Sequence, residues 1–121
     1  ATLTIEPGVE VSFDSGKSLQ VNGTLVARGT SVGNIIFSSS KEVPTAGDWG
    51  RIYFTDGSKD ATFDGSGNYT GGSILEYCEI SYAGGSSAGG ALTIESSSPF
   101  INYCTIRNSA TNGIYIYQGG H

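Results

Sequence analysis

The chain has 121 residues, of which 37% are hydrophobic, 14% are charged and 19 are glycine, and its net charge is −5. This length fits a single domain, and the acidic balance with only six scattered lysines and arginines makes nucleic acid an unexpected partner. No apolar run approaches the length of a membrane-spanning helix, so we expect no membrane insertion.

Short segments of alternating apolar and polar residues follow one another along the chain. They cover residues 3–5, 9–13, 19–21, 25–27, 52–54, 92–94 and 114–116. Alternation with a period of two predicts strands with one buried face, and turn pairs such as Pro7-Gly8 and Asn22-Gly23 separate them. No window has the spacing of an amphipathic helix, so the sequence predicts an all-β chain.

Residues 55–73 are polar and rich in glycine, and we expect them to protrude as a loop. Within this loop Asp56, Asp60 and Asp64 follow one another at steps of four, and their carboxylates are candidate ligands for calcium. The spacing matches neither the EF-hand loop nor the nonapeptide calcium repeat. A solvated acidic loop is therefore the alternative, and no other cofactor is expected.

An internal repeat narrows the choice of fold. Residues 75–80 (LEYCEI) and 101–106 (INYCTI) are similar at an offset of 26, which is about one coil of a three-sheet solenoid. Leu75 and Cys78 are three positions apart, yet both are apolar enough to be buried. Two inward side chains at an odd spacing require a bend between them, and the second copy repeats the pattern. The repeat predicts a parallel β-helix of about four to five coils rather than a sandwich.

Cys78 and Cys104 occupy equivalent positions in the two copies. In neighbouring coils their Cα atoms would lie about 5 Å apart, a distance that a disulfide can span. Parallel side chains suit two stacked thiols better, so the sequence favours free cysteines and leaves the disulfide as the alternative.

The predicted strands place Tyr53, Thr93 and Tyr115 in one outward column, with Glu95 and Tyr117 in the column beside it. The candidate carbohydrate-binding residues on this face are Tyr53, Tyr115, Tyr117, Arg51 and Glu95. Tyrosine rings can stack on sugars while charged groups bind sugar hydroxyls. The alternatives are ordinary exposed strand residues or a contact with another protein. Trp49, which lies between a loop and a strand, is expected to pack at a corner of the coil.

Four segments, residues 3–13, 19–30, 47–54 and 98–108, resemble coils of secreted proteins of the pectin-lyase-like superfamily. The resemblance implies a right-handed parallel β-helix and an extracellular or cell-surface location. Pectate lyases of this superfamily use acidic calcium ligands with an arginine, and its polygalacturonases use several aspartates and a histidine. The only histidine here is His121, and no strand carries paired outward aspartates, so we assign no catalytic residues.

Residues 1–121 are expected to form one β-helix domain, either a segment of a longer solenoid or a subunit that stacks into a filament, because no capping helix is predicted at either end. Copies of the chain or adjoining coils are then the expected partners, and polysaccharide is a further one. We expect a non-catalytic extracellular structural or adhesive module. The alternatives are a carbohydrate-binding β-helix and a fragment of a polysaccharide lyase or hydrolase.

Overall fold

The computed structural model describes residues 2–85 and 90–117, and in this part of the chain it contains fourteen strands and no helix. Twelve strands form three four-stranded parallel sheets, and the other two form an antiparallel hairpin. The prediction of an all-β chain is confirmed. The strands are rich in β-branched and aromatic residues, as in Ile-Tyr-Phe of residues 52–54, which suit a half-buried pleated surface.

We name the parallel sheets A, B and C in the order in which the chain reaches them. Sheet A contains β1 (Thr2–Ile5), β4 (Thr24–Arg28), β9 (Ile74–Glu76) and β12 (Phe100–Asn102). Sheet B contains β2 (Glu10–Phe13), β5 (Ile35–Ser39), β10 (Cys78–Ser81) and β13 (Thr105–Arg107). Sheet C contains β3 (Leu19–Val21), β6 (Ile52–Phe54), β11 (Gly90–Glu95) and β14 (Asn112–Tyr117).

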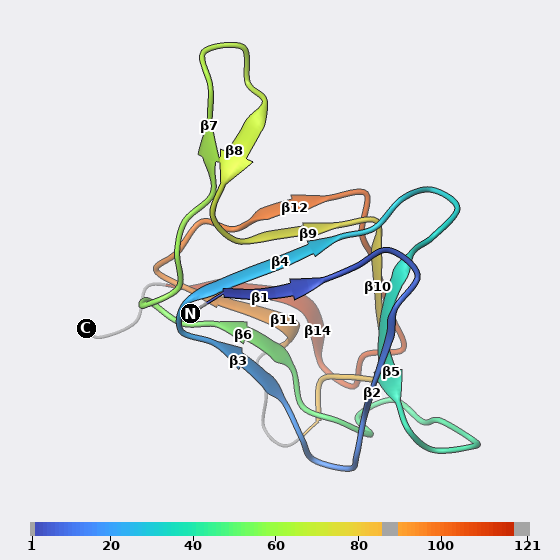
Figure 1. The fold of residues 1–121 in the computed structure, drawn as a ribbon. Helices are drawn as coiled ribbons and strands as arrows, with labels where there is room; N and C mark the ends of the chain where they lie inside the picture. Colours follow the sequence, from blue (N-terminus) through green and yellow to red (C-terminus); the bar gives the residue numbers. More distant parts are fainter. Residues whose placement is uncertain (1, 86–89, 118–121) are drawn as a thin grey trace.

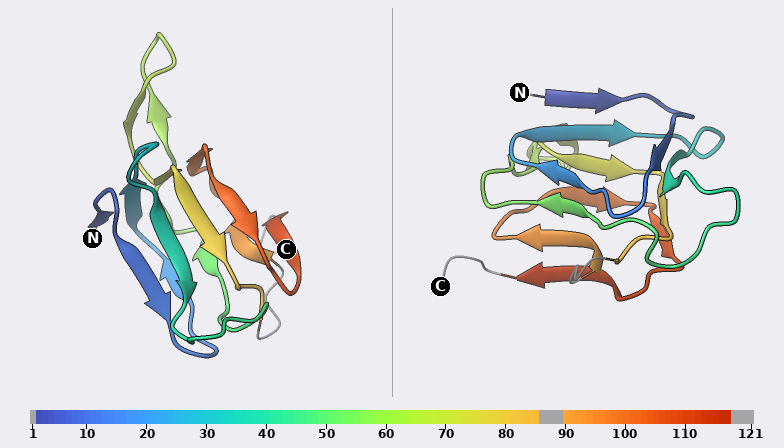
Figure 2. Two further views of the ribbon diagram at one scale, coloured as in Figure 1. Left: turned by 90° about the vertical axis from the view of Figure 1, so that its right-hand side faces the viewer. Right: turned by 90° about the horizontal axis from the view of Figure 1, so that it is seen from below.

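The chain passes through sheets A, B and C in this order four times, and we call each passage a circuit. Figure 1 looks along the axis around which the circuits run, with the three sheets on three sides of a common interior. Seen from the side in Figure 2, the circuits lie one beside the next, and the first and the last circuit occupy opposite ends.

The two copies of the internal repeat lie in neighbouring circuits, in parallel register. Leu75 pairs with Ile101 in sheet A, and Ile80 pairs with Ile106 in sheet B. The bend required by the odd spacing is at Tyr77, whose φ is 51°, and at the equivalent Tyr103, whose φ is 52°. This left-handed conformation is uncommon for a residue with a side chain. It turns the chain from sheet A to sheet B while both flanking side chains stay inside.

The core is contributed mainly by the two middle circuits. Leu25, Phe37, Ile80 and Leu92 expose 1% of their surface or less. Side chains of neighbouring circuits stack in register along the interior, so each middle circuit is covered on both sides. The first and last circuits are covered on one side only.

Trp49 packs in the interior at the turn between sheets B and C, as the sequence predicts. It is completely buried, and its ring stacks on Phe13 with 4.0 Å between centroids and 4° between planes. The indole Nε1 donates a hydrogen bond of 2.8 Å to the carbonyl oxygen of Ser81. The single tryptophan thus connects the first three circuits through one ring.

The protruding segment predicted as a loop contains an antiparallel hairpin, β7 (Thr62–Phe63) and β8 (Tyr69–Gly71), which projects from the turn between sheets C and A (Figure 1). The aromatic ring of Phe63 packs edge-on against Tyr69 and Phe100, with centroids 6.4 and 5.2 Å apart. The chain re-enters sheet A at Gly72, whose φ is 87° and where a Cβ atom would collide with the Asp60 carbonyl. Aromatic pairing and glycine geometry therefore give this polar segment more structure than its composition predicts.

Candidate functional site

The outer face of sheet C brings together three of the predicted carbohydrate-binding residues. The Tyr53 hydroxyl donates a hydrogen bond to the Glu95 carboxylate, and the guanidinium carbon of Arg51 lies 4.1 Å from the centroid of the Tyr53 ring. Tyr53, Thr93 and Tyr115 are paired residues of neighbouring strands, as predicted, and Tyr115 is 41% exposed. The backbone of Tyr117 pairs with Glu95, but its side chain lies outside the described part of the structure.

These residues mainly satisfy one another. Arg51 covers a face of the Tyr53 ring, and the Tyr53 hydroxyl is engaged by Glu95. Thr93, which we expected to be exposed in the middle of the column, is completely buried, and its hydroxyl donates to the Gly90 carbonyl at 3.2 Å. The flat strip expected for a sugar ring is therefore interrupted at its centre, and stacking on the covered face of Tyr53 would require Arg51 to move away.

The three aspartates of the predicted calcium site do not come together. Among residues 2–85 and 90–117, no group of three His, Cys, Asp or Glu side chains is arranged to hold a metal ion. Asp60 accepts a hydrogen bond of 2.9 Å from the Ser98 backbone N–H, at the base of the hairpin. Asp64 accepts from the backbone N–H groups of Ser66 and Asn68 at 2.8 and 3.0 Å. Asp60 and Asp64 are thus used to organise the backbone, in different parts of the segment.

Asp64 gives the hairpin a dependence on pH. Backbone hydrogen bonds, first from Asn68 and then from Ser66, lower the pKa of the Asp64 carboxyl below its ordinary value. A lowered folded-state pKa means that these bonds stabilise the hairpin above the unfolded-state pKa and are lost as the pH falls through the folded-state pKa. We expect an NMR titration of Asp64 to give a midpoint below 3.8, the ordinary value for an aspartate, and the Asn68 amide to exchange faster once Asp64 is protonated. A midpoint at or above 3.8 would contradict the observed turn.

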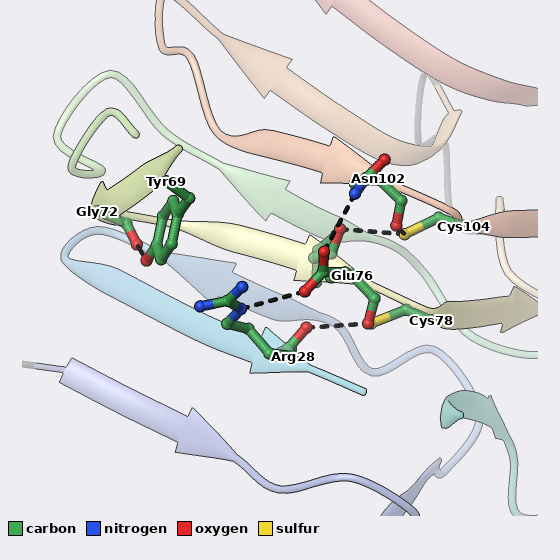
Figure 3. A network of polar contacts seen from close by, with 9 residues as sticks. Arg28, Tyr69, Gly72, Glu76, Cys78, Asn102 and Cys104 are labelled. Atoms are coloured by element: carbon green, nitrogen blue, oxygen red, sulfur yellow. Dashed lines mark hydrogen bonds and ion pairs between the residues drawn. The ribbon is translucent and has the colours of Figure 1, made fainter. Parts of the chain in front are cut away.

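Outside sheet A lies a polar ladder that the sequence analysis did not identify (Figure 3). Arg28, Glu76 and Asn102 are paired residues of β4, β9 and β12. Glu76 accepts a hydrogen bond of 3.1 Å from Arg28 Nε and another of 3.1 Å from Asn102 Nδ2. The Arg28 guanidinium also lies 5.0 Å from the centroid of the Tyr69 ring, and the Tyr69 hydroxyl donates to the Gly72 carbonyl. Partial burial raises the pKa of Tyr69, so this hydroxyl stays a donor at neutral pH.

The ladder connects circuits rather than forming a cleft. The ion pair between Arg28 and Glu76 joins the second circuit to the third. The hydrogen bond from the Asn102 amide to Glu76 joins the fourth circuit to the third. A second ion pair, 2.7 Å between Arg107 Nη2 and Glu79 Oε1, joins the third and fourth circuits on sheet B. The side chains of Arg28 and Glu76 are 49% and 17% exposed, so the pair contributes about 0–1 kcal/mol to folding. The two ion pairs, Arg28–Glu76 and Arg107–Glu79, therefore favour the observed register between neighbouring circuits.

Cys78 and Cys104 are both free thiols, in agreement with the alternative favoured from the sequence. The Cys78 sulfur lies 3.4 Å from the carbonyl oxygen of Ala27, and the Cys104 sulfur lies 3.2 Å from that of Leu75 (Figure 3). The electrostatic interaction between the two neighbouring thiols lowers the pKa of Cys104 to about 7 and raises the pKa of Cys78; burial raises the pKa of Cys78 further.

The two ends of the stack of circuits expose apolar side chains that belong to the interior columns. At the first circuit Leu3 and Val9 are 50% and 40% exposed, whereas Leu25, the neighbour of Leu3 in the second circuit, is 1% exposed. At the last circuit Ile114 and Ile116 are 47% and 67% exposed. Isolated exposed apolar residues are ordinary, but these lie at equivalent places in the core of a repeating structure.

The first circuit also contains a shallow pocket of about 320 Å³. It is lined by residues 2–3 of β1 and 19–25 of β3, β4 and the turn between them. Its apolar lining includes Leu3, Leu19, Val21 and Leu25, which all belong to the interior columns. The pocket is thus the open end of the core rather than a cleft lined by chemically reactive side chains.

Comparisons with protein-family models, with curated proteins and with solved structures found no match to this chain. Within residues 2–85 and 90–117, the structure has no helix with the length and apolar character needed to cross a bilayer. The assignment of a function therefore depends on the arrangement of the chain's own residues.

Proposed function

We propose that this chain is a right-handed parallel β-helix that serves as a non-catalytic, extracellular or cell-surface structural module, extended by stacking in register on further copies of itself. The cyclic order of the three parallel sheets supports the β-helix. In Figure 1 the path from β1 through β2 and β3 runs clockwise while later circuits recede from the viewer, which supports the right-handed sense.

The observation that carries the proposal is the exposure of interior columns at both ends. A repeat protein with open ends leaves apolar core and unpaired strand edges in water unless a cap or a neighbour covers them. Here the described strands reach both ends without a covering element, and Leu3 at one end and Ile116 at the other are 50% and 67% exposed. A head-to-tail contact between copies would cover both ends with one kind of interface.

The registers of sheet C indicate how two copies would fit together. Leu19, Ile52, Leu92 and Ile114 form one interior column, and Val21, Phe54, Ile94 and Ile116 form the next. In a copy added in register after the last circuit, Leu19 would therefore follow Ile114, and Val21 would follow Ile116. Both of these first-circuit residues line the 320 Å³ pocket, so the exposed isoleucines of one copy would fill the pocket of the next.

The path of the chain also allows this addition. The last strand, β14, belongs to sheet C, and the first, β1, belongs to sheet A, which is the next sheet in the cyclic order. At the corner between sheets A and B the exposed ring of Tyr103, 70% accessible, is the outermost of a stacked pair with Tyr77 at 4.8 Å. In an added copy the first corner, which contains Pro7, would lie against this exposed ring.

Electron microscopy of the purified chain over a range of concentrations tests this function. We expect rods of uniform width that lengthen with concentration, because a head-to-tail contact that does not close forms filaments. Particles that stay single at every concentration, or closed dimers, would refute the stacking. As a test of the non-catalytic assignment, acidic polysaccharide with calcium should give no unsaturated products; their appearance would favour a lyase fragment.

A further inference from the structure

We propose that Cys78 and Cys104 form a binding site for one two-coordinate soft cation, such as Cu(I) or Ag(I), held between sulfurs of neighbouring circuits. Cys78 is the first residue of β10 and Cys104 directly precedes β13, and Glu79 and Thr105, the residues that follow them, are paired in sheet B. Both thiols are free. This site is independent of the proposed stacking, because both ligands belong to one chain.

The two thiols have equivalent surroundings in neighbouring circuits. Cys78 lies beside the Ala27 and Glu76 carbonyls, and Cys104 lies beside the Leu75 and Asn102 carbonyls. Ala27 pairs with Leu75, and Glu76 pairs with Asn102. Two side chains with matching partners in successive circuits point the same way, so their sulfurs are separated by about the strand spacing, ~4.8 Å.

This separation suits a bridging metal better than a disulfide. Metal–thiolate bonds of about 2.3 Å on each side of one ion span about 4.6 Å, close to the strand spacing. A disulfide requires its sulfurs to lie about 2.05 Å apart. Reaching that distance would turn both side chains toward each other and away from the carbonyls beside them. A bridged ion leaves the backbone and both side chains close to where they are.

The number of ligands selects the kind of ion. In the described parts of the chain, no cluster of three or more His, Cys, Asp or Glu side chains can hold a metal, so the site offers two sulfurs only. Structural zinc sites are almost always four-coordinate, whereas soft thiolates select Cu(I). On binding, each thiol releases its proton to water and each sulfur forms one bond to the ion, with no change of oxidation state. Cys78 is 2% exposed and Cys104 is partly buried, so the ion would be largely shielded from water.

Titration of the intact chain with Ag(I) in chloride-free buffer tests the site, since silver is not oxidised or reduced under these conditions. We expect one ion per chain by native mass spectrometry, with an ultraviolet thiolate charge-transfer band that saturates at this ratio. X-ray absorption at the silver edge should show two sulfur neighbours and no nitrogen or oxygen. A tenfold excess of Zn(II) should leave the silver in place.

Cys78→Ser and Cys104→Ser should each weaken binding by at least 100-fold while circular dichroism reports the same fold. The variant Cys78→Ser/Ile36→Cys is the matched control: it keeps two thiols per chain but places one of them on the outer face of sheet B, and it should bind as weakly as Cys78→Ser. Unchanged affinity in a serine variant or in this control, two ions per chain, or displacement by Zn(II) would overturn the proposal. The X-ray absorption result on the unsubstituted chain decides the matter if a variant does not fold.

Discussion

Replacing Ile116 by Asp is expected to abolish end-to-end association while leaving the single chain folded. In the proposed contact Ile116 enters the apolar pocket beside Val21 of the next copy, where a carboxylate would lose its water without gaining a partner. The effective cost of burying an unpaired charge is several kcal/mol, and each 1.4 kcal/mol is about tenfold in affinity. We therefore expect association to weaken by at least about 100-fold, as measured by sedimentation velocity.

The stability of the single chain should hardly change, because Ile116 is 67% exposed there. Val32→Asp is the matched control: Val32 is 97% exposed in a loop outside the interior columns, and this variant should associate like the unsubstituted chain. If the Ile116→Asp variant associates normally, or if the Val32→Asp variant associates as poorly as Ile116→Asp, then the two ends of the stack of circuits are not the surfaces through which copies associate.

Trp49→Ala is expected to cause a large loss of folding stability. It removes a completely buried ring that stacks on Phe13 at 4.0 Å, and it leaves the Ser81 carbonyl without its 2.8 Å donor. Truncation of a buried tryptophan to alanine costs about 3–5 kcal/mol. This is a large part of the about 5–15 kcal/mol that stabilises a typical domain, so the variant will be only marginally folded.

Urea unfolding followed by circular dichroism measures this effect. Trp49→Phe keeps an aromatic ring against Phe13 but loses the hydrogen bond, so it should cost less than Trp49→Ala. Tyr103→Ala removes an aromatic ring that is 70% exposed, and its cost should be smaller than either. A loss below about 1 kcal/mol for Trp49→Ala would show that the ring does not join the circuits.

The internal repeat made the parallel arrangement predictable. Because residues 75–80 and 101–106 keep the same odd spacing between buried residues, the sequence located both bends, and the structure has left-handed residues at Tyr77 and Tyr103. Propensity alone would not place tyrosine in this conformation, since it is strained for a side-chain residue. The requirement to bury Leu75 and Cys78 on either side of the bend overrides that preference.

The candidate sites were less predictable, for two physical reasons. Arg28 and Glu76 pair across 48 residues because the hairpin is inserted between their circuits, so no constant offset reveals the ladder. The sequence correctly predicted which residues of sheet C pair with one another. The pairing does not determine how exposed each side chain is, and Thr93 is buried where a binding surface was expected. The even spacing of the aspartates does not bring their carboxylates together, since Asp64 accepts hydrogen bonds from the backbone of its own turn.

The central claim, in-register stacking of identical β-helices, is tested most directly by a distance between equivalent residues of successive copies. A spin label can be attached to Val32→Cys in a chain that also carries Cys78→Ser and Cys104→Ser, since Val32 is 97% exposed. Each sheet has four strands per copy, so pulsed electron paramagnetic resonance should give an intermolecular distance of about 19 Å, four times the ~4.8 Å spacing, together with its multiples. The absence of dipolar coupling, or a single distance without multiples, would contradict the account.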